Sequence, residues 1–380
     1  MIPLSIPNLA GNEWQYVKEC IETGWISSVG AYVGKFEQMV ADYAGAKYGV
    51  ATVNGTAAIH IALELAGVGE DDLVIVPNIT FIASANAVRY TGADPLLIDV
   101  NPHTWQMDLD LLEQFLLKET YYKRNHCYRK SDHRRIAAIL PVHVLGNMCD
   151  MDRLLQLAQQ NAITVIEDST EALGSRYKSK NAGTFGLMGT FSFNGNKIIS
   201  TGGGGVIVTN DELLAKKAKH ITNQAKTDPF EYVHDEVGYN YRLVNVLAAI
   251  GVAQMEQLPD FITRKKVIDR LYRDGLEGKA GDVVFQRVGD NVDPNCWLHT
   301  LKTAHQRPLI QHLLDNGVQC RPFWVPMNRL RMFRGEQYIT VHDEAGKVYE
   351  SCISIPSSTS LTDEQVHEVI RVIRGFFEAR

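Results

Sequence analysis

Lys197 stands in a segment whose residue types suit covalent chemistry with an aldehyde. It ends the stretch Ser192-Phe193-Asn194-Gly195-Asn196-Lys197, where a strand-like run leads toward the glycine tract at 202–205. A lysine amine forms a Schiff base with an aldehyde when it is held where it loses its proton. The alternative is a solvated surface lysine, because most lysines are exposed. The segment predicts a reactive lysine beside an anion-binding loop.

Asp168 offers a carboxylate that suits the same chemistry. It follows the apolar run 162–166, which has the pattern of a buried strand. A carboxylate at the carboxyl end of a parallel strand faces the usual ligand crevice, where it keeps a pyridine nitrogen protonated so that the ring accepts electrons. A helix N-cap is the alternative, because Asp168-Ser169-Thr170-Glu171 also has a capping sequence. With Lys197, Asp168 predicts a pyridoxal 5′-phosphate site.

A strand, a turn of small residues and a helix are predicted around Gly55 and Thr56. The apolar run 50–53 passes through Asn54-Gly55 into an alanine-rich helical pattern. Free N–H groups at such a helix start bind phosphate, and the small residues leave room for it. An ordinary strand-to-helix turn is the alternative. We expect the phosphate of the cofactor here if Lys197 holds its aldehyde.

Taken together, these segments resemble the DegT-type sugar aminotransferases, which are pyridoxal-phosphate enzymes of fold type I. The resemblance covers nearly the whole chain. Its motifs are Gly24-Trp25-Ile26-Ser27-Ser28, Asn54 to Ala58, Pro77-Asn78-Ile79-Thr80-Phe81, Asp99-Val100, Pro141-Val142-His143, Glu167 to Gly174, Ser192 to Lys197 and Gly238-Tyr239-Asn240-Tyr241-Arg242.

The resemblance implies a role for each candidate residue. Lys197 would form the Schiff base and Asp168 would pair with the pyridine nitrogen. Gly55, Thr56 and Ser192 would hold the phosphate, and Phe81 would lie against the cofactor ring. Asn240 would reach the phosphate of the neighbouring subunit, so a homodimer with shared active sites is implied and a monomer would be inactive.

Two departures from the common family pattern bear on the substrate. Glu171 replaces glutamine or histidine, and Asn194-Gly195-Asn196 precedes the lysine. Both variants resemble the branch that acts on UDP-linked 4-keto-6-deoxy-N-acetylhexosamines, which places that substrate first and a GDP- or dTDP-linked keto-sugar second. Glu171 is expected to contact the cofactor or the sugar, because it lies three residues beyond Asp168.

Transamination is implied rather than deoxygenation, because the dehydratase branch carries histidine where this chain has Lys197. The resemblance also implies glutamate as amino donor and two half-reactions, in which the lysine moves the proton. A nucleotide-sugar or cofactor-binding regulator without turnover is the alternative from another class. The intact Lys197 and Asp168 count against it.

Alternating strand and helix patterns predict an α/β fold. Apolar runs at 73–76, 96–100, 136–144, 162–166 and 206–208 alternate with helical patterns such as 151–161. This order is typical of a mainly parallel sheet flanked by helices. We expect a large cofactor-binding domain over residues 1–250 and a small C-terminal α+β domain over residues 251–380. A helix over 244–258 is expected to end or kink at Pro259 before another over 260–276.

Composition excludes several classes of protein. The 380 residues are 45% hydrophobic, which suits a sizeable core, and the net charge of −6 gives no nucleic-acid footprint. Six cysteines without paired spacing favour reduced thiols over a metal site. Neither a signal peptide nor a membrane-spanning stretch is predicted, so a cytoplasmic enzyme is expected.

Two further segments have open interpretations. Between Lys118 and Arg135, basic and aromatic residues are interleaved, which suits either contact with a nucleotide or, as we favour, a solvated loop. The stretch 321–326 contains Trp324, which is expected either to line a sugar or nucleotide pocket or, as we favour, to pack within a loop.

Overall fold

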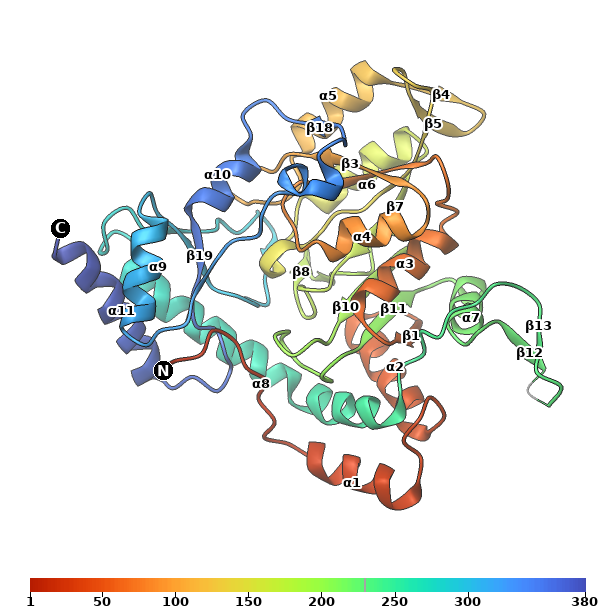
Figure 1. Ribbon diagram of the computed structural model, residues 1–380, viewed down its shortest axis with the longest axis horizontal. Helices are drawn as coiled ribbons and strands as arrows, with labels where there is room; N and C mark the ends of the chain where they lie inside the picture. Colours follow the sequence, from red (N-terminus) through yellow and green to blue (C-terminus); the bar gives the residue numbers. More distant parts are fainter. Residues whose placement is uncertain (229) are drawn as a thin grey trace.

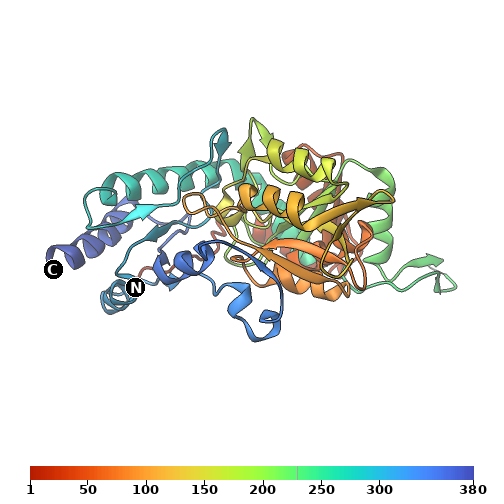
Figure 2. The same ribbon diagram turned by 90° about the horizontal axis from the view of Figure 1, so that it is seen from above.

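Two sheets of unequal size organise the chain, and one long helix runs from the larger to the smaller (Figure 1). The structure is a computed structural model that describes residues 1–380 except residue 229. Both termini lie at the end that holds the small sheet, and the β12–β13 hairpin (Lys226–Asp228 and Val233–His234) extends from the opposite end (Figure 2).

The large sheet is mixed and mostly parallel, as predicted. Along its order, the strands from β10 to β18 run parallel, whereas β11 is antiparallel to both of its neighbours. That order is β1 (Tyr48–Thr52), β11 (Gly205–Thr209), β10 (Met188–Ser192), β7 (Thr164–Asp168), β6 (Arg135–Ile139), β2 (Leu73–Pro77), β3 (Asp94–Ile98) and β18 (Tyr338–Ile339). β6 is shorter than the predicted 136–144, because residues 144–146 form a 3₁₀ turn.

Helices cover both faces of this sheet. Successive side chains of a strand point to opposite faces, so Leu73 and Ile75 pack with one helix layer while Val74 and Val76 pack with the other. Burying each such side chain contributes about 1.5–3 kcal/mol. The covering helices are α2 (Ala31–Ala44), α3 (Gly55–Leu65), α4 (Ala83–Tyr90), α5 (Leu109–Glu119), α6 (Met151–Gln160) and α7 (Glu212–Ile221). The helix α1 (Glu13–Thr23) packs against α8 (Asn245–Leu276) instead.

The helix α8 (Asn245–Leu276) continues through Pro259, so of the two expected outcomes, an end or a kink, the end was wrong. A proline inside a helix removes one backbone hydrogen bond. Here the helix is held by packing at both ends: Ala248 and Val252 join the core beneath α2, and Ile268 and Tyr272 join the core of the small sheet. Tertiary packing therefore outweighs the local cost of the proline. The predicted domain boundary at residue 250 falls within this helix and remains a prediction.

The small sheet is antiparallel and lies against the far half of α8. Its order is β14 (Val284–Phe285), β16 (Thr300–Lys302), β19 (Cys352–Ser354) and β17 (Arg321–Pro322). The helices of this part are α9 (Gln306–Asp315), α10 (Glu344–Ser351) and α11 (Asp363–Glu378). Among the described helices, none combines the length and apolar character of a membrane span.

Shorter strands complete the fold. β8 (Arg176–Tyr177), β9 (Lys180–Asn181) and β15 (Val292–Asp293) form a three-stranded sheet, and β4 (Thr120–Lys123) pairs with β5 (His126–Arg129), which joins β6. The basic stretch at 118–135 is thus a hairpin rather than a loop. Arg129, Arg134 and Arg135 form ion pairs with Asp132, Asp94 and Asp72.

Candidate active site

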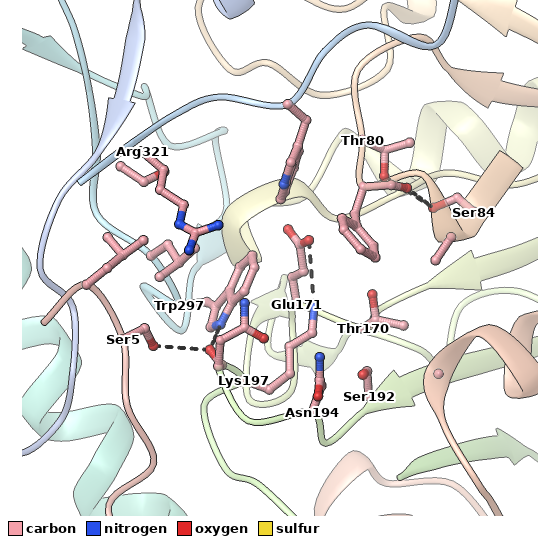
Figure 3. Close-up of a pocket in the computed structure, with 18 of the residues that line it drawn as sticks. Ser5, Thr80, Ser84, Thr170, Glu171, Ser192, Asn194, Lys197, Trp297 and Arg321 are labelled. Atoms are coloured by element: carbon pink, nitrogen blue, oxygen red, sulfur yellow. Dashed lines mark hydrogen bonds and ion pairs between the residues drawn. The ribbon is translucent and has the colours of Figure 1, made fainter. Parts of the chain in front are cut away.

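Seven of the eight predicted site residues line one cavity. Because β1, β7 and β10 point the same way, their carboxyl ends meet at one edge of the large sheet, and a cavity of about 1070 Å³ opens there against the small sheet (Figure 3). The predicted residues in its lining are Gly55, Thr56, Phe81, Asp168, Glu171, Ser192 and Lys197. Asn240 is exposed and does not line it.

Lys197 projects into the cavity from the loop that joins β10 to β11. Its side chain is 11% exposed, and its Nζ lies 3.8 Å from Oε1 of Glu171. Burial lowers the pKa of Lys197, while the carboxylates of Glu171 and Asp168 oppose that shift. A buried amine with a lowered pKa loses its proton readily, which is the property that attack on an aldehyde requires.

Glu171 is the nearest charged partner of this amine. It lies in the turn after β7, and its Oε2 accepts a hydrogen bond of 2.8 Å from the backbone N–H of Leu145. Burial raises the pKa of Glu171 to about 7, although Lys197 acts in the opposite direction. A carboxyl group with a pKa of about 7 thus lies beside an amine whose pKa is lowered, so this pair is suited to hold and pass on a proton.

Asp168 is the last residue of β7 and is 1% exposed. Its Oδ2 accepts a 2.6 Å hydrogen bond from Oγ of Ser84, and its Oδ1 accepts a 3.2 Å bond from the Thr170 N–H. Ser84 Oγ also lies 3.2 Å from Oγ1 of Thr80. The residues after Asp168 form turns, so the helix N-cap alternative was wrong. These turns bring Glu171 back to the cavity.

The neighbouring Glu167 fixes the end of β7 from the opposite side. Its Oε1 accepts hydrogen bonds from the N–H groups of Phe185 and Gly186, and its Oε2 accepts one from Gly183 and lies 3.0 Å from Nε2 of His143. Glu167 and His143 are fully buried. A carboxylate with this many donors is rigidly held, so the strand that carries Asp168 has little freedom.

The start of α3 provides the predicted anion site. Asn54 caps this helix by accepting from the Ala57 N–H at 2.8 Å, and its carbonyl accepts from Ala58. The N–H groups of Gly55 and Thr56 have no acceptor within the described part of the chain, so they are available to an anion.

Close packing explains the glycine at this helix start. A Cβ atom at Gly55 would lie 2.7 Å from Cβ of Ser192, which is too close for a real contact. Gly55 therefore keeps the space between α3 and the end of β10, where the Ser192 hydroxyl lines the cavity. Two free N–H groups, a hydroxyl, a buried amine and a buried carboxylate match the chemical groups of pyridoxal 5′-phosphate.

Phe81 lies at the cavity, whereas Asn240 lies outside it. The Phe81 ring lines the cavity, is 54% exposed and lies 6.5 Å from the ring of Trp324 between centroids. Asn240 forms an isolated bridge with Asn223 away from the cavity. Its predicted contact is with a second subunit, so that role remains a prediction.

Sequence reasoning missed several residues of the cavity or left them open. Trp324 lines it, together with Trp297 and Arg321, and it also packs within its loop against a buried cluster, so both interpretations of Trp324 hold. Ser84 lies one helical turn beyond the quoted Thr80-Phe81 segment, and that spacing was the available signal. Trp297 had no such signal, because it lies outside every quoted motif and reaches the cavity only through the fold. The 118–135 hairpin contributes no residue to this cavity.

Comparisons with known proteins agree with this geometry. Residues 7–374 match the DegT/DnrJ/EryC1/StrS aminotransferase family. A GDP-perosamine synthase of Escherichia coli O157:H7 is 40% identical over 99% of this chain and 98% of its own length. A GDP-perosamine synthase of Caulobacter vibrioides is 36% identical over 98% and 97%.

A solved structure agrees as well. It is the PLP-form of a putative sugar aminotransferase, Spr1654, from Streptococcus pneumoniae, with a TM-score of 0.89 and 25% identity over 100% of this chain and 99% of that one. The fold, the cofactor and the enzymatic class predicted from sequence are confirmed, whereas the UDP-linked branch is not. The chain belongs to the DegT/DnrJ/EryC1/StrS aminotransferase family and is a pyridoxal-phosphate-dependent sugar aminotransferase.

Proposed function

We propose that this enzyme transfers an amino group from glutamate to the C4 ketone of a GDP-linked 4-keto-6-deoxy sugar, giving a GDP-perosamine type of product. The observation that carries the proposal is a buried amine, Lys197, in one cavity with Asp168 and an anion-binding helix start. GDP replaces the expected UDP because two relatives that match almost the whole chain are GDP-perosamine synthases.

Each of several cavity residues has its own role in the proposed reaction. When bound, pyridoxal phosphate supplies an aldehyde for the amine and a ring that accepts electrons. Lys197 would hold that group and, once the donor amine has displaced it, would take up the proton lost from the Cα of the amino donor. Asp168, fixed by Ser84 and Thr170, would keep a positive charge on the ring nitrogen of the bound group. Glu171 takes up or returns the proton that Lys197 carries.

The outer wall of the cavity suits a nucleotide-linked sugar. Arg321 projects from β17 of the small sheet toward the cavity and has no ion pair among the residues that the structure describes (Figure 3). A guanidinium group binds phosphate oxygens with two parallel hydrogen bonds. The faces of Trp324 and Phe81 offer stacking surfaces for a sugar or a base. We assign Arg321 to the diphosphate or to the carboxylate of the amino donor.

We also propose a homodimer in which Asn240 completes the partner's site. This residue is exposed and stands outside the cavity of its own chain, so it is available to a second copy. Mixing the inactive Lys197→Ala and the weakened Asn240→Ala proteins, after unfolding and refolding together, should restore activity. A hybrid dimer contains one site with both native residues. Activity that does not exceed the sum of the two separate variants would contradict a shared site.

The substrate is tested by competition among nucleotide sugars. The holoenzyme is supplied with glutamate and with equal amounts of GDP-, UDP- and dTDP-linked 4-keto-6-deoxy sugars, and the amino sugars formed are quantified by mass spectrometry. The proposal predicts the GDP-linked product first. Faster formation of the UDP-linked product would favour the original expectation, and consumption of no sugar would remove the proposed acceptor class.

A further inference from the structure

Trp297 contacts Lys197 at two points, and no step proposed so far uses it. Its indole N–H donates a 2.7 Å hydrogen bond to the carbonyl of Asn196, which belongs to the peptide bond that precedes the lysine. Its ring face lies 4.3 Å from the lysine Nζ, measured to the ring centroid. One side chain thus contacts both the backbone and the reactive end of Lys197 (Figure 3).

The position of Trp297 is fixed by buried polar groups. Its carbonyl accepts a 2.7 Å bond from Nζ of Lys265, a lysine of α8 that also binds the carbonyl of Ser357. The backbone N–H of Trp297 donates a hydrogen bond of 3.0 Å to Oδ1 of Asn295. Lys265 is 2% exposed and has no carboxylate partner among the described residues, so its bonds go to backbone carbonyls.

Asn295 connects this segment to the turn that carries Glu171. Its Nδ2 donates to the carbonyls of Glu171 and Leu173 at 2.8 and 2.9 Å, and Asn295 is fully buried. The amine of Lys197 therefore has two neighbours held by one network: the carboxylate of Glu171 and the ring face of Trp297. Such a support keeps a reactive group in place within a fraction of an ångström.

We propose that Trp297 is a positioning residue for Lys197, which sets both the direction of its amine and the readiness with which that amine gives up its proton. The electron-rich ring face stabilises the ammonium form, because a cation is attracted to an indole face. The indole N–H fixes the backbone from which the side chain starts. This inference rests on the proposed role of Lys197, and it identifies Trp297 as the residue that holds Lys197 in position.

The test follows how the full-length protein, freed of cofactor, captures added pyridoxal phosphate. The neutral amine attacks the aldehyde carbon, a carbon–nitrogen bond forms and the aldehyde oxygen leaves as water, so the rate of capture rises with pH until the amine is fully neutral. Rapid mixing with detection of visible absorption gives two numbers for each variant, the midpoint of this pH profile and the plateau rate.

Two substitutions separate the two contacts. Trp297→Leu removes the ring face, so the midpoint should move to lower pH by about 0.4 to 1.5 units. Trp297→Phe keeps an aromatic face but removes the N–H, so the plateau rate should fall while the midpoint moves less than in the leucine variant. Trp105→Leu is the matched control, since Trp105 is buried in the same apolar cluster as Trp297 and does not line the cavity.

Each outcome decides one part of the inference. If Trp297→Leu and Trp105→Leu share the wild-type midpoint, the ring face does not act on the amine. If Trp297→Phe keeps the wild-type plateau, the N–H does not position the lysine. If Trp297→Leu fails to fold, the phenylalanine variant still decides the second point, and an unshifted midpoint in a Trp297→Met variant, which also lacks the ring, would overturn the first. Capture of the cofactor by Lys197→Ala would instead overturn the proposed role of Lys197, whatever Trp297 does.

Discussion

The Nζ of Lys197 lies 3.8 Å from Oε1 of Glu171, and both side chains are buried at the edge of the large sheet where Asp168 ends β7. Burial disfavours the charged form of each group, so it lowers the pKa of the lysine and raises that of the glutamate to about 7. Both shifts favour a neutral amine beside a neutral carboxyl group, so Glu171 can hold a proton within reach of Lys197.

Replacing Glu171 by Gln should change how stability depends on pH. The ordinary pKa of this carboxyl is 4.5 and its folded pKa is raised to about 7. Between these values the folded protein keeps a proton that the unfolded chain has released, so wild-type stability falls as pH rises through the window. Glutamine does not titrate. The stability of Glu171→Gln relative to wild type should rise by up to roughly 3 kcal/mol from pH 4.5 to 7.

Urea unfolding of both proteins at several pH values measures this difference. Glu212→Gln serves as control, because Glu212 is exposed and pairs with Lys216 on the surface of α7. A constant difference between wild type and Glu171→Gln across the window would show that Glu171 titrates as an ordinary carboxyl group.

Adding a methyl group at Gly55 should destroy the anion site. The new Cβ would lie 2.7 Å from Cβ of Ser192, so the start of α3 must move away from the end of β10. We expect Gly55→Ala to weaken pyridoxal phosphate binding at least about tenfold, since a shift of one ångström disorders the hydrogen bonds to a phosphate. Gly203→Ala is the control, because Gly203 lines the same cavity and its nearest atom is a carbonyl oxygen at 3.8 Å. Equal binding constants for the two variants, measured by fluorescence titration, would contradict a phosphate site at Gly55.

Asp168→Asn should leave the cofactor bound but slow the chemistry. The amide keeps the shape of the carboxylate and loses the charge that holds a proton on the ring nitrogen. Removing such an electrostatic partner costs roughly 10²- to 10³-fold in rate. The change in visible absorption during a single turnover, after addition of glutamate, measures this rate. Ser84→Ala removes only the 2.6 Å bond to Asp168 and should slow the reaction less. A rate for Asp168→Asn at or above that of Ser84→Ala would contradict the assignment.

Glu167→Gln should destabilise the fold more than any surface glutamate. The carboxylate accepts hydrogen bonds from three backbone N–H groups and lies beside His143. An amide directs an NH₂ group at some of these donors, so buried hydrogen bonds are lost at a cost of about 3 kcal/mol. Denaturant unfolding without cofactor measures the change. A loss below about 0.5 kcal/mol, the scale expected for the exposed Glu212, would contradict the role of Glu167.

Features of the fold that depend on neighbouring residues could be predicted from the sequence, whereas features that depend on contacts between distant residues could not. Strands such as 73–76 and 162–166 were predictable because their apolar runs record burial on both faces. The turn after Asp168 was not, since its shape depends on Asn295, which is more than a hundred residues away and binds the Glu171 and Leu173 carbonyls. The place of Trp297 beside Lys197 could not be predicted for the same reason, because the two residues are far apart in the sequence. The end of the helix at Pro259 was wrongly predicted because local helix rules do not include the packing of α8 on two cores.

Borohydride reduction of the holoenzyme, followed by peptide mass spectrometry, tests the central claim most directly. Reduction fixes the cofactor to the nitrogen that holds it. We expect one pyridoxyl group, on the peptide that contains Lys197, and its loss in the Lys197→Ala protein. Lys265 is the informative comparison, because this deeply buried lysine lines a small pocket that Lys197 also lines, and its amine is bound to two carbonyls. A pyridoxyl group on Lys265 or on any other lysine, with Lys197 unmodified, would contradict it.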